Sequence, residues 1–270
     1  MPRTILARSA LLTLAALANP ACAKEEGPAR NYRTIWLIEP TDAPAGKLVL
    51  GEGALIIQQR LLPLAMVTLS EDYVAAKPEE SLAKGTQLVL ADGAEKAVFC
   101  STKYKRPGTL TQILSIGPET GTQRCFVDAD NDGKFDQTFV GFNNLQTLPS
   151  VFGRLPKNPI PVLPLAYKNA RSADFAEKYY VGIQYIRQSG VGKKRRFQLV
   201  YGAGKPWGTF SFDDIINPLE TKRDTDLPKK ISRLGAVITI LGGGKGMVEY
   251  QVDAMMPAQP FGVVVSTSTY

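Results

Sequence analysis

Carboxylate side chains recur at every second position in one short segment of this 270-residue chain. Asp128, Asp130 and Asp132 alternate with other residues, and Gly133 and Asp136 follow them. Calcium prefers about six to eight oxygen ligands, and a single loop supplies several of them when alternate side chains converge and the backbone then turns sharply. The spacing therefore predicts an oxygen-ligand calcium loop in which these aspartates bind the ion.

The same loop offers two further ligands, the backbone carbonyl of Lys134 and the carboxylate of Asp136, the latter directly or through water. From Asp128 to Asp136 the segment resembles calcium loops of the EF-hand and dockerin type, which implies calcium as the bound ion. Phe139 stands where those loops have a bidentate glutamate, and neither flank has a helical pattern. We therefore expect a structural calcium ion on a β hairpin, not a calcium switch.

A plain turn explains part of the same pattern. Asn131, Asp132 and Gly133 lie between two strand-like segments, 125–128 and 135–139, and Asp-Gly is among the strongest hairpin signals. Carboxylates crowded on one turn repel one another when no cation is bound. The sequence thus leaves two readings open, a calcium-stabilised hairpin and an acidic turn without metal.

The chain contains no histidine, which excludes a Ser-His-Asp triad, a Cys-His pair and zinc sites built on imidazole. A hydrolase that uses two carboxylates about 5 to 9 Å apart, as glycosidases do, remains as the alternative. Its candidate acids are Asp213, Asp214, Glu177 and Glu249. We favour a protein without catalytic activity and keep a hydrolase acting on envelope polysaccharide as the alternative.

The first 23 residues predict the cellular compartment. Residues 1–23 carry basic but no acidic side chains, then the apolar run 9–17, and they end in small residues up to Ala23. This is the layout of a secretory signal peptide, and the apolar run is too short to span about 30 Å of hydrocarbon. We expect cleavage after Ala23 and an exported protein, periplasmic or extracellular. A lipoprotein anchored through Cys22 is the minor alternative.

Cleavage would leave two cysteines, Cys100 and Cys125. A pair of cysteines in an oxidising compartment predicts one disulfide. Its loop-closure contribution to stability would be roughly 3 kcal/mol. Two buried free thiols are the other reading.

The net charge of +7 is spread along the chain, so it does not predict a nucleic-acid partner. The exception is the basic run 193–196, expected at a hairpin tip as a solvated cluster or, less favoured, as a contact for anionic lipid or polysaccharide. Trp207 lies between proline and glycine and is the best candidate for stacking on a glycan. An envelope glycan or an envelope protein is therefore the expected partner class.

Glycine and proline interrupt the mature chain about every ten residues, and the segments between them are short and rich in β-branched and aromatic residues, which predicts an all-β antiparallel fold. Candidate strands are 33–38, 47–50, 54–60, 64–70, 87–91, 97–101, 110–116, 125–128, 135–139, 179–188, 196–201, 208–212, 235–241, 247–252 and 261–266.

The segment 148–175 differs because it carries several prolines, which disfavour a central strand or a helix interior. We therefore expect an N-terminal β unit at 24–147, a proline-rich connection at 148–175 that ends near a short helix at 172–178, and a C-terminal β unit at 176–270. The two units are either packed β domains or the two sheets of one sandwich. The whole pattern predicts an exported, calcium-stabilised binding or structural module of the cell envelope.

Overall fold

The computed structural model describes residues 31–105, 121–143, 148–187, 195–205, 207–209, 219–221, 227–244 and 246–262. Within these ranges the regular structure is β strand, together with two 3-10 turns, η1 (Pro78–Glu80) and η2 (Ser172–Asp174). Every strand pairing is antiparallel. The all-β antiparallel fold expected from the sequence is confirmed.

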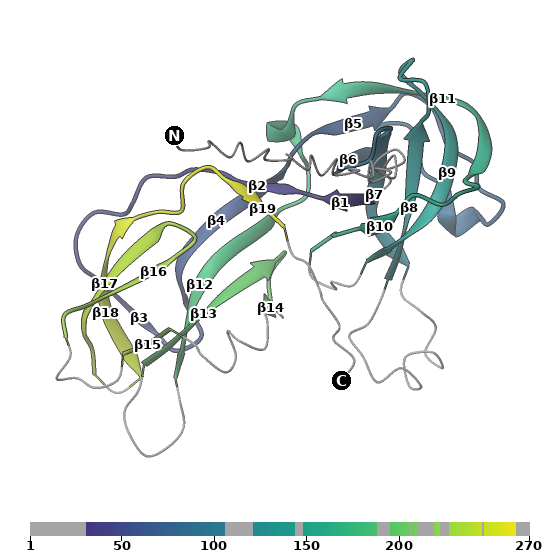
Figure 1. Cartoon of the computed structure of the whole chain (residues 1–270). Coiled ribbons are helices and arrows are strands. Elements are labelled where there is room, and N and C mark those ends of the chain that lie inside the picture. Colours follow the sequence, from purple (N-terminus) through teal and green to yellow (C-terminus); the bar gives the residue numbers. More distant parts are fainter. Residues whose placement is uncertain are drawn as a thin grey trace, which may run out of the picture.

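Six of the strands form a closed ring, seen on the right of Figure 1. In spatial order they are β6 (Gln87–Asp92), β5 (Met66–Leu69), β11 (Ile160–Ala170), β9 (Lys134–Asn143), β8 (Gly121–Asp128) and β7 (Ala97–Lys105). The ring closes because β7 also pairs with β6. β1 (Asn31–Thr34) adds to β6, and β10 (Phe152–Arg154) pairs with β1.

Two further sheets form a sandwich on the left of Figure 1. The larger sheet has the order β14 (Gly208–Thr209), β13 (Arg195–Gly202), β12 (Tyr179–Arg187), β4 (Leu55–Pro63), β2 (Trp36–Ile38) and β19 (Pro260–Phe261), with β15 (Leu219–Thr221) also paired to β13. The smaller sheet has the order β16 (Lys229–Arg233), β17 (Ala236–Gly242), β18 (Met247–Ala254) and β3 (Leu48–Gly51).

The sandwich core follows from alternation along its strands. In β17 the buried residues Ala236, Ile238 and Ile240 alternate with half-buried ones, as a strand with one face on a core requires. They belong to the same buried cluster as Val181 and Ile183 of the larger sheet. The two sheets therefore pack face to face over one apolar layer.

The ring buries apolar side chains on both of its faces. Its inner cluster includes Leu88, Phe99, Phe126 and Phe135, each from a different ring strand. Its outer cluster contains the two cysteines, residues that alternate with them, and Tyr32 of β1. The closed sheet thus separates an inner core from an outer core that β1 and the segment around β10 cover.

The chain passes between ring and sandwich three times, from β1 to β2, from β4 to β5, and from η2 to β12. Trp36 is fully buried at this junction, and its indole N–H donates to the carbonyl of Pro149 at 3.1 Å. Met66 and Val89 of ring strands belong to the sandwich cluster, so the apolar core is continuous from one body to the other.

This pairing groups the strands differently from their order in the sequence. Residues 36–63 pair with strands of the C-terminal half, although the sequence places them within the expected 24–147 unit. The division of the chain into separately folding domains stays a prediction.

The proline-rich segment holds more regular structure than we expected. β11 occupies 160–170 and is a member of the ring. Pro161 and Pro164 are accommodated because this half of β11 pairs with β9 alone and its register shifts between Pro161 and Leu165, where a missing N–H costs least. The helix expected at 172–178 is only the single turn η2.

Candidate metal centre

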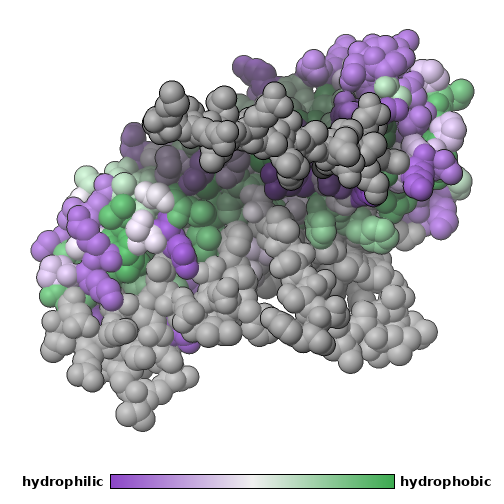
Figure 2. All heavy atoms as spheres, in the orientation of Figure 1, coloured by the Kyte–Doolittle hydropathy of each residue, from purple (hydrophilic) through white to green (hydrophobic). Residues whose placement is uncertain are grey.

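The acidic loop joins β8 to β9 at the top of the ring in Figure 1, and Figure 2 shows hydrophilic side chains gathered there. One carboxylate oxygen from each of Asp128, Asp130 and Asp136 lies within 4.8 Å of the other two. The loop was predicted from sequence as a hairpin, and the ladder between β8 and β9 confirms that the two strands pair. Three of the four predicted carboxylates are therefore brought together.

Asp128 is the buried base of the loop. Its side chain has no exposed surface, and its carboxylate accepts hydrogen bonds from the backbone N–H of Asp132 at 3.2 Å, from that of Gly133 at 3.0 Å and from the Tyr167 hydroxyl at 2.7 Å. Three donors offset the cost of burying a carboxylate. Asn131 and Gly133 take positive φ angles of 61° and 87°, which turn the backbone over this carboxylate.

The other predicted ligands divide into two kinds. Asp136, half-buried, accepts from the N–H of Ala129 at 2.9 Å, and Asp130 is exposed at the rim of the group. Asp132 lies outside the group, and its Oδ1 accepts from the N–H of Lys134 at 2.8 Å. Lys134 is the first residue of β9 and pairs with Ala166 of β11.

Tyr167, a residue not predicted from the sequence, links the loop to the ring core. Its ring stacks on Phe135 at a centroid distance of 4.4 Å while its hydroxyl donates to Asp128. Burial, together with the hydrogen bond to Asp128 and the negative charge there, raises the pKa of Tyr167 above its ordinary value. No local signal ties residue 167 to residue 128, because the contact depends on the pairing of β9 with β11.

The group fits a calcium ion in size and chemistry. Carboxylate oxygens bind calcium at about 2.3–2.6 Å, so two oxygens on one ion lie at most about 5 Å apart. The three carboxylates satisfy that limit. Phe139, at the position where loops of the EF-hand and dockerin type carry a glutamate, is buried in the outer ring core. The loop side chains therefore offer three clustered carboxylates, and further oxygens would come from backbone or water.

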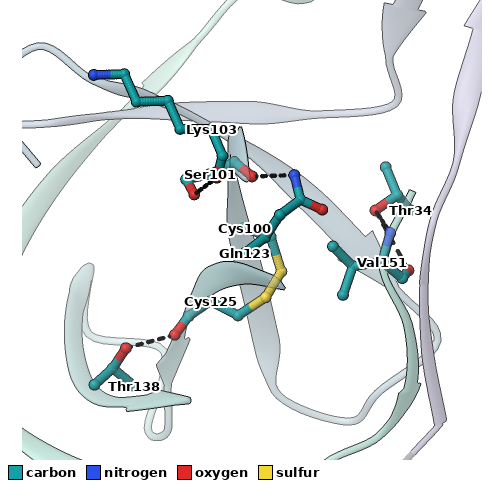
Figure 3. The surroundings of a disulfide bond; sticks show 8 residues. All are labelled: Thr34, Cys100, Ser101, Lys103, Gln123, Cys125, Thr138 and Val151. Carbon is teal, nitrogen blue, oxygen red and sulfur yellow. Dashed lines mark hydrogen bonds between the residues drawn. A yellow bond between two sulfur atoms is a disulfide. The ribbon is translucent and has the colours of Figure 1, made fainter. Parts of the chain in front are cut away.

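The disulfide predicted from sequence is present. Cys100 of β7 and Cys125 of β8 are directly paired across the two strands and are bonded at 2.04 Å, with both residues fully buried. Figure 3 shows Val151 beside the bond and the Gln123 amide donating to the carbonyl of Ser101 nearby. The bond fastens the strand that leads into the acidic loop.

Of the four acids proposed for the hydrolase alternative, the two that the structure describes differ from one another in their surroundings. The carboxylate of Glu177 accepts hydrogen bonds from the hydroxyls of Thr102 and Tyr179. Glu249 lies in β18 opposite Val49 of β3. Asp213 and Asp214 fall outside the described residues.

The candidate ligand-binding side chains are less exposed than the sequence suggested. Trp207 is half-buried, and its indole N–H is buried with no hydrogen-bond partner in the part of the chain that the structure describes. In the basic run, Arg195 is 7% exposed and donates to the carbonyl of Gly243 at 2.8 Å. Lys193 and Lys194 lie outside the described residues. Arg195 is therefore a packing residue and not part of a solvated tip.

Comparisons with protein-family models, with curated proteins and with solved structures found no match. Among the described residues, no helix has the length and apolar character needed to cross a bilayer.

Proposed function

We propose that this protein is an exported binding or structural module of the cell envelope, and that the acidic loop stabilises it by holding a calcium ion. The single observation that carries the proposal is the convergence of Asp128, Asp130 and Asp136 on the β8–β9 hairpin. A set of oxygen ligands alone favours a hard cation such as calcium. The buried disulfide supports an oxidising compartment.

The ion would act on the fold. Asp128 already organises the turn and holds Tyr167 against the ring interior. An ion between the three carboxylates would remove their mutual repulsion, which is about 1 kcal/mol for two unit charges 4 Å apart in water and more where water is excluded. The hairpin and the β9–β11 ladder would gain stability together.

Thermal unfolding of the purified protein in millimolar calcium and in chelator tests the proposal. At a calcium concentration about a hundredfold above Kd, binding adds about 2.7 kcal/mol. For a chain of this size that corresponds to a rise in Tm of about 5 to 10 °C. A Tm that is the same in calcium and in chelator would contradict it.

A matched pair of variants assigns the effect to the group. Asp130→Asn removes one exposed ligand charge while keeping an oxygen that can accept from the Asp132 N–H. Asp132→Asn removes an exposed charge from the same turn but outside the group. We expect the calcium-dependent rise to be lost in Asp130→Asn and kept in Asp132→Asn. Equal loss in both would show that calcium only screens the charge of the turn.

A further inference from the structure

A groove of about 630 Å³ opens on the ring where β5 and β11 separate. The two strands pair as far as Leu69 and Tyr167, and the N–H of Ser70 then donates to the carbonyl of Ala166 at 2.9 Å. Beyond that point the N–H of Ala166 donates to the side chain of Glu71 instead of to a strand partner. Segment 71–77 and the first half of β11 therefore become two walls of a groove.

The β11 wall has backbone groups outside the ladder. Ile160 and Pro161 pair with β9, pairing resumes at Leu165, and residues 162–164 have no ladder partner in the described part of the chain. Pro161 and Pro164 fix the backbone of this stretch in an extended conformation. This stretch of the wall therefore has main-chain groups outside the described ladders, on a backbone that needs little further ordering.

Exposed apolar side chains stand on both walls. Leu163 is 90% exposed and Val74 is 82% exposed, the two highest values among large apolar residues that the structure describes, and Ile160 is 59% exposed. All three line the groove. Exposed apolar surface that is gathered in one concave place marks a binding surface more often than scattered side chains do.

Acidic groups stand at the same place. Glu71 and Asp72 each use one carboxylate oxygen to accept a backbone N–H, from Ala166 and from Lys84 respectively. Glu80 is paired with Arg124, so that pair adds no net charge. Lys77 is the other cation of the lining, and the groove carries an acidic excess in a chain whose net charge is +7.

We infer that this groove binds an extended peptide segment with aliphatic side chains and one lysine or arginine. Aliphatic side chains would cover Leu163 and Val74, the peptide backbone would bond to residues 162–164, and the cation would meet Glu71 and Asp72. Strand-like peptides are recognised in this way, with main-chain bonds for affinity and side-chain contacts for specificity. The volume lies within the range of about 300–1,000 Å³ usual for binding sites.

The inference rests on the binding-module part of the proposed function and uses a surface other than the calcium loop. A random heptapeptide phage library panned on the immobilised full chain tests it. We expect selected peptides to combine aliphatic residues with a lysine or arginine. Absence of enriched peptides, or enrichment without a basic residue, would overturn the inference.

Variants then locate the binding. Fluorescence anisotropy measures the Kd of a synthetic, labelled peptide of the selected sequence. Leu163→Asp should weaken the binding of this peptide at least tenfold. Val49→Asp, at a 61% exposed position on β3 of the sandwich, serves as the matched control and should leave Kd unchanged. Equal weakening by both variants, or by neither, would overturn the assignment to this groove.

A variant without the Glu71 charge tests whether the acidic side chains contribute to peptide binding. Glu71→Gln keeps an oxygen for the Ala166 N–H and removes the negative charge. It should weaken binding of the basic peptide severalfold. Binding of a peptide that has glutamine in place of the basic residue should be unchanged. Binding of the protein to anionic vesicles that Leu163→Asp abolishes, with no peptide bound, would identify a lipid surface as the occupant and overturn the inference.

The two proposals fail separately. Peptide binding with no calcium effect on Tm would remove the calcium site and leave the groove. A calcium-dependent Tm with no peptide bound would leave the calcium loop and remove the groove.

Discussion

The sandwich and the ring bury their apolar residues in different ways. Among the described residues, the sandwich and its junction with the ring share one cluster of 25 buried residues, whereas the ring has two clusters of eight, one inside and one outside the closed sheet. A closed sheet splits its core in two, and small cores stabilise less and depend more on covalent or metal ties. The disulfide and the acidic loop both lie in the ring.

The largest expected effect is in the sandwich. Leu61 of β4 is fully buried, and Leu61→Ala should lower the free energy of unfolding by about 2 to 5 kcal/mol, because it leaves a cavity in the continuous core. Urea unfolding measures it. Val49→Ala, at an exposed position of the same body, should change stability by less than about 0.5 kcal/mol, and a similar loss in both variants would contradict the assignment of Leu61 to the core.

Removal of the disulfide should have the largest effect in the ring. The double change Cys100→Ala with Cys125→Ala should cost about 3 kcal/mol, since the bond closes a loop with a sequence separation of 25. Urea unfolding of the oxidised protein, beside the variant, measures this. Equal urea midpoints for the oxidised protein and the double variant would show that the ring does not depend on the disulfide. The contrast with the sandwich would then be wrong.

Gly141 lies against the disulfide and gives a second test of how tightly the ring is packed there. A Cβ atom at Gly141 would lie 2.5 Å from Cγ1 of Val151 and 2.9 Å from Sγ of Cys125. Gly141→Ala should therefore cost about 1 to 3 kcal/mol by overpacking. Gly244→Ala, where a Cβ would meet nothing within 4 Å, is the control, and thermal melts of the two variants should differ by several degrees.

The smallest effect concerns alkaline pH. Burial raises the pKa of Tyr32 from 10.0 to about 12, so the folded state holds this proton more tightly than the unfolded chain does. The contribution of the protonated Tyr32 hydroxyl to the free energy of unfolding is complete below pH 10 and is lost as the pH rises towards 12. Tyr32→Phe should flatten the fall in Tm over that interval, and curves of equal slope for the two proteins would contradict it.

Local pattern was enough to predict much of the strand content. Alternation predicted β12 and β17 nearly to their ends, and hairpin chemistry predicted the turn between β8 and β9. These features depend on neighbouring residues. β16 was missed because Lys229–Arg233 reads as a polar segment with one apolar residue, and only Ile231 is buried.

Long-range pairing was not readable from the sequence. Nothing near residues 55–63 indicates that β12, more than a hundred residues further along the chain, is their partner. β11 was not predicted because prolines disfavour a strand except at an unpaired edge or a register shift. β11 has both, but they depend on its pairing with β9 and cannot be inferred from its own residues.

The candidate site was partly predictable for the same reason. Sequence spacing identified the acidic residues of the turn, but it did not separate Asp132, which lies outside the group, from Asp136, whose carboxylate belongs to it. Spacing describes the reach of a side chain, whereas the path of the backbone through Asn131 and Gly133 decides its direction.

The three passages of the chain between ring and sandwich also determine the order in which the protein can fold as it is made. β4 is synthesised early, yet its central neighbour β12 begins at Tyr179, opposite Leu61. β2 and β4 can pair with each other at once, but the other edge of β4 stays open until more than half of the chain has been made. Such non-local pairing slows folding and leaves strand edges open to aggregation, so we expect self-association to compete with folding mainly before the second half of the chain is made.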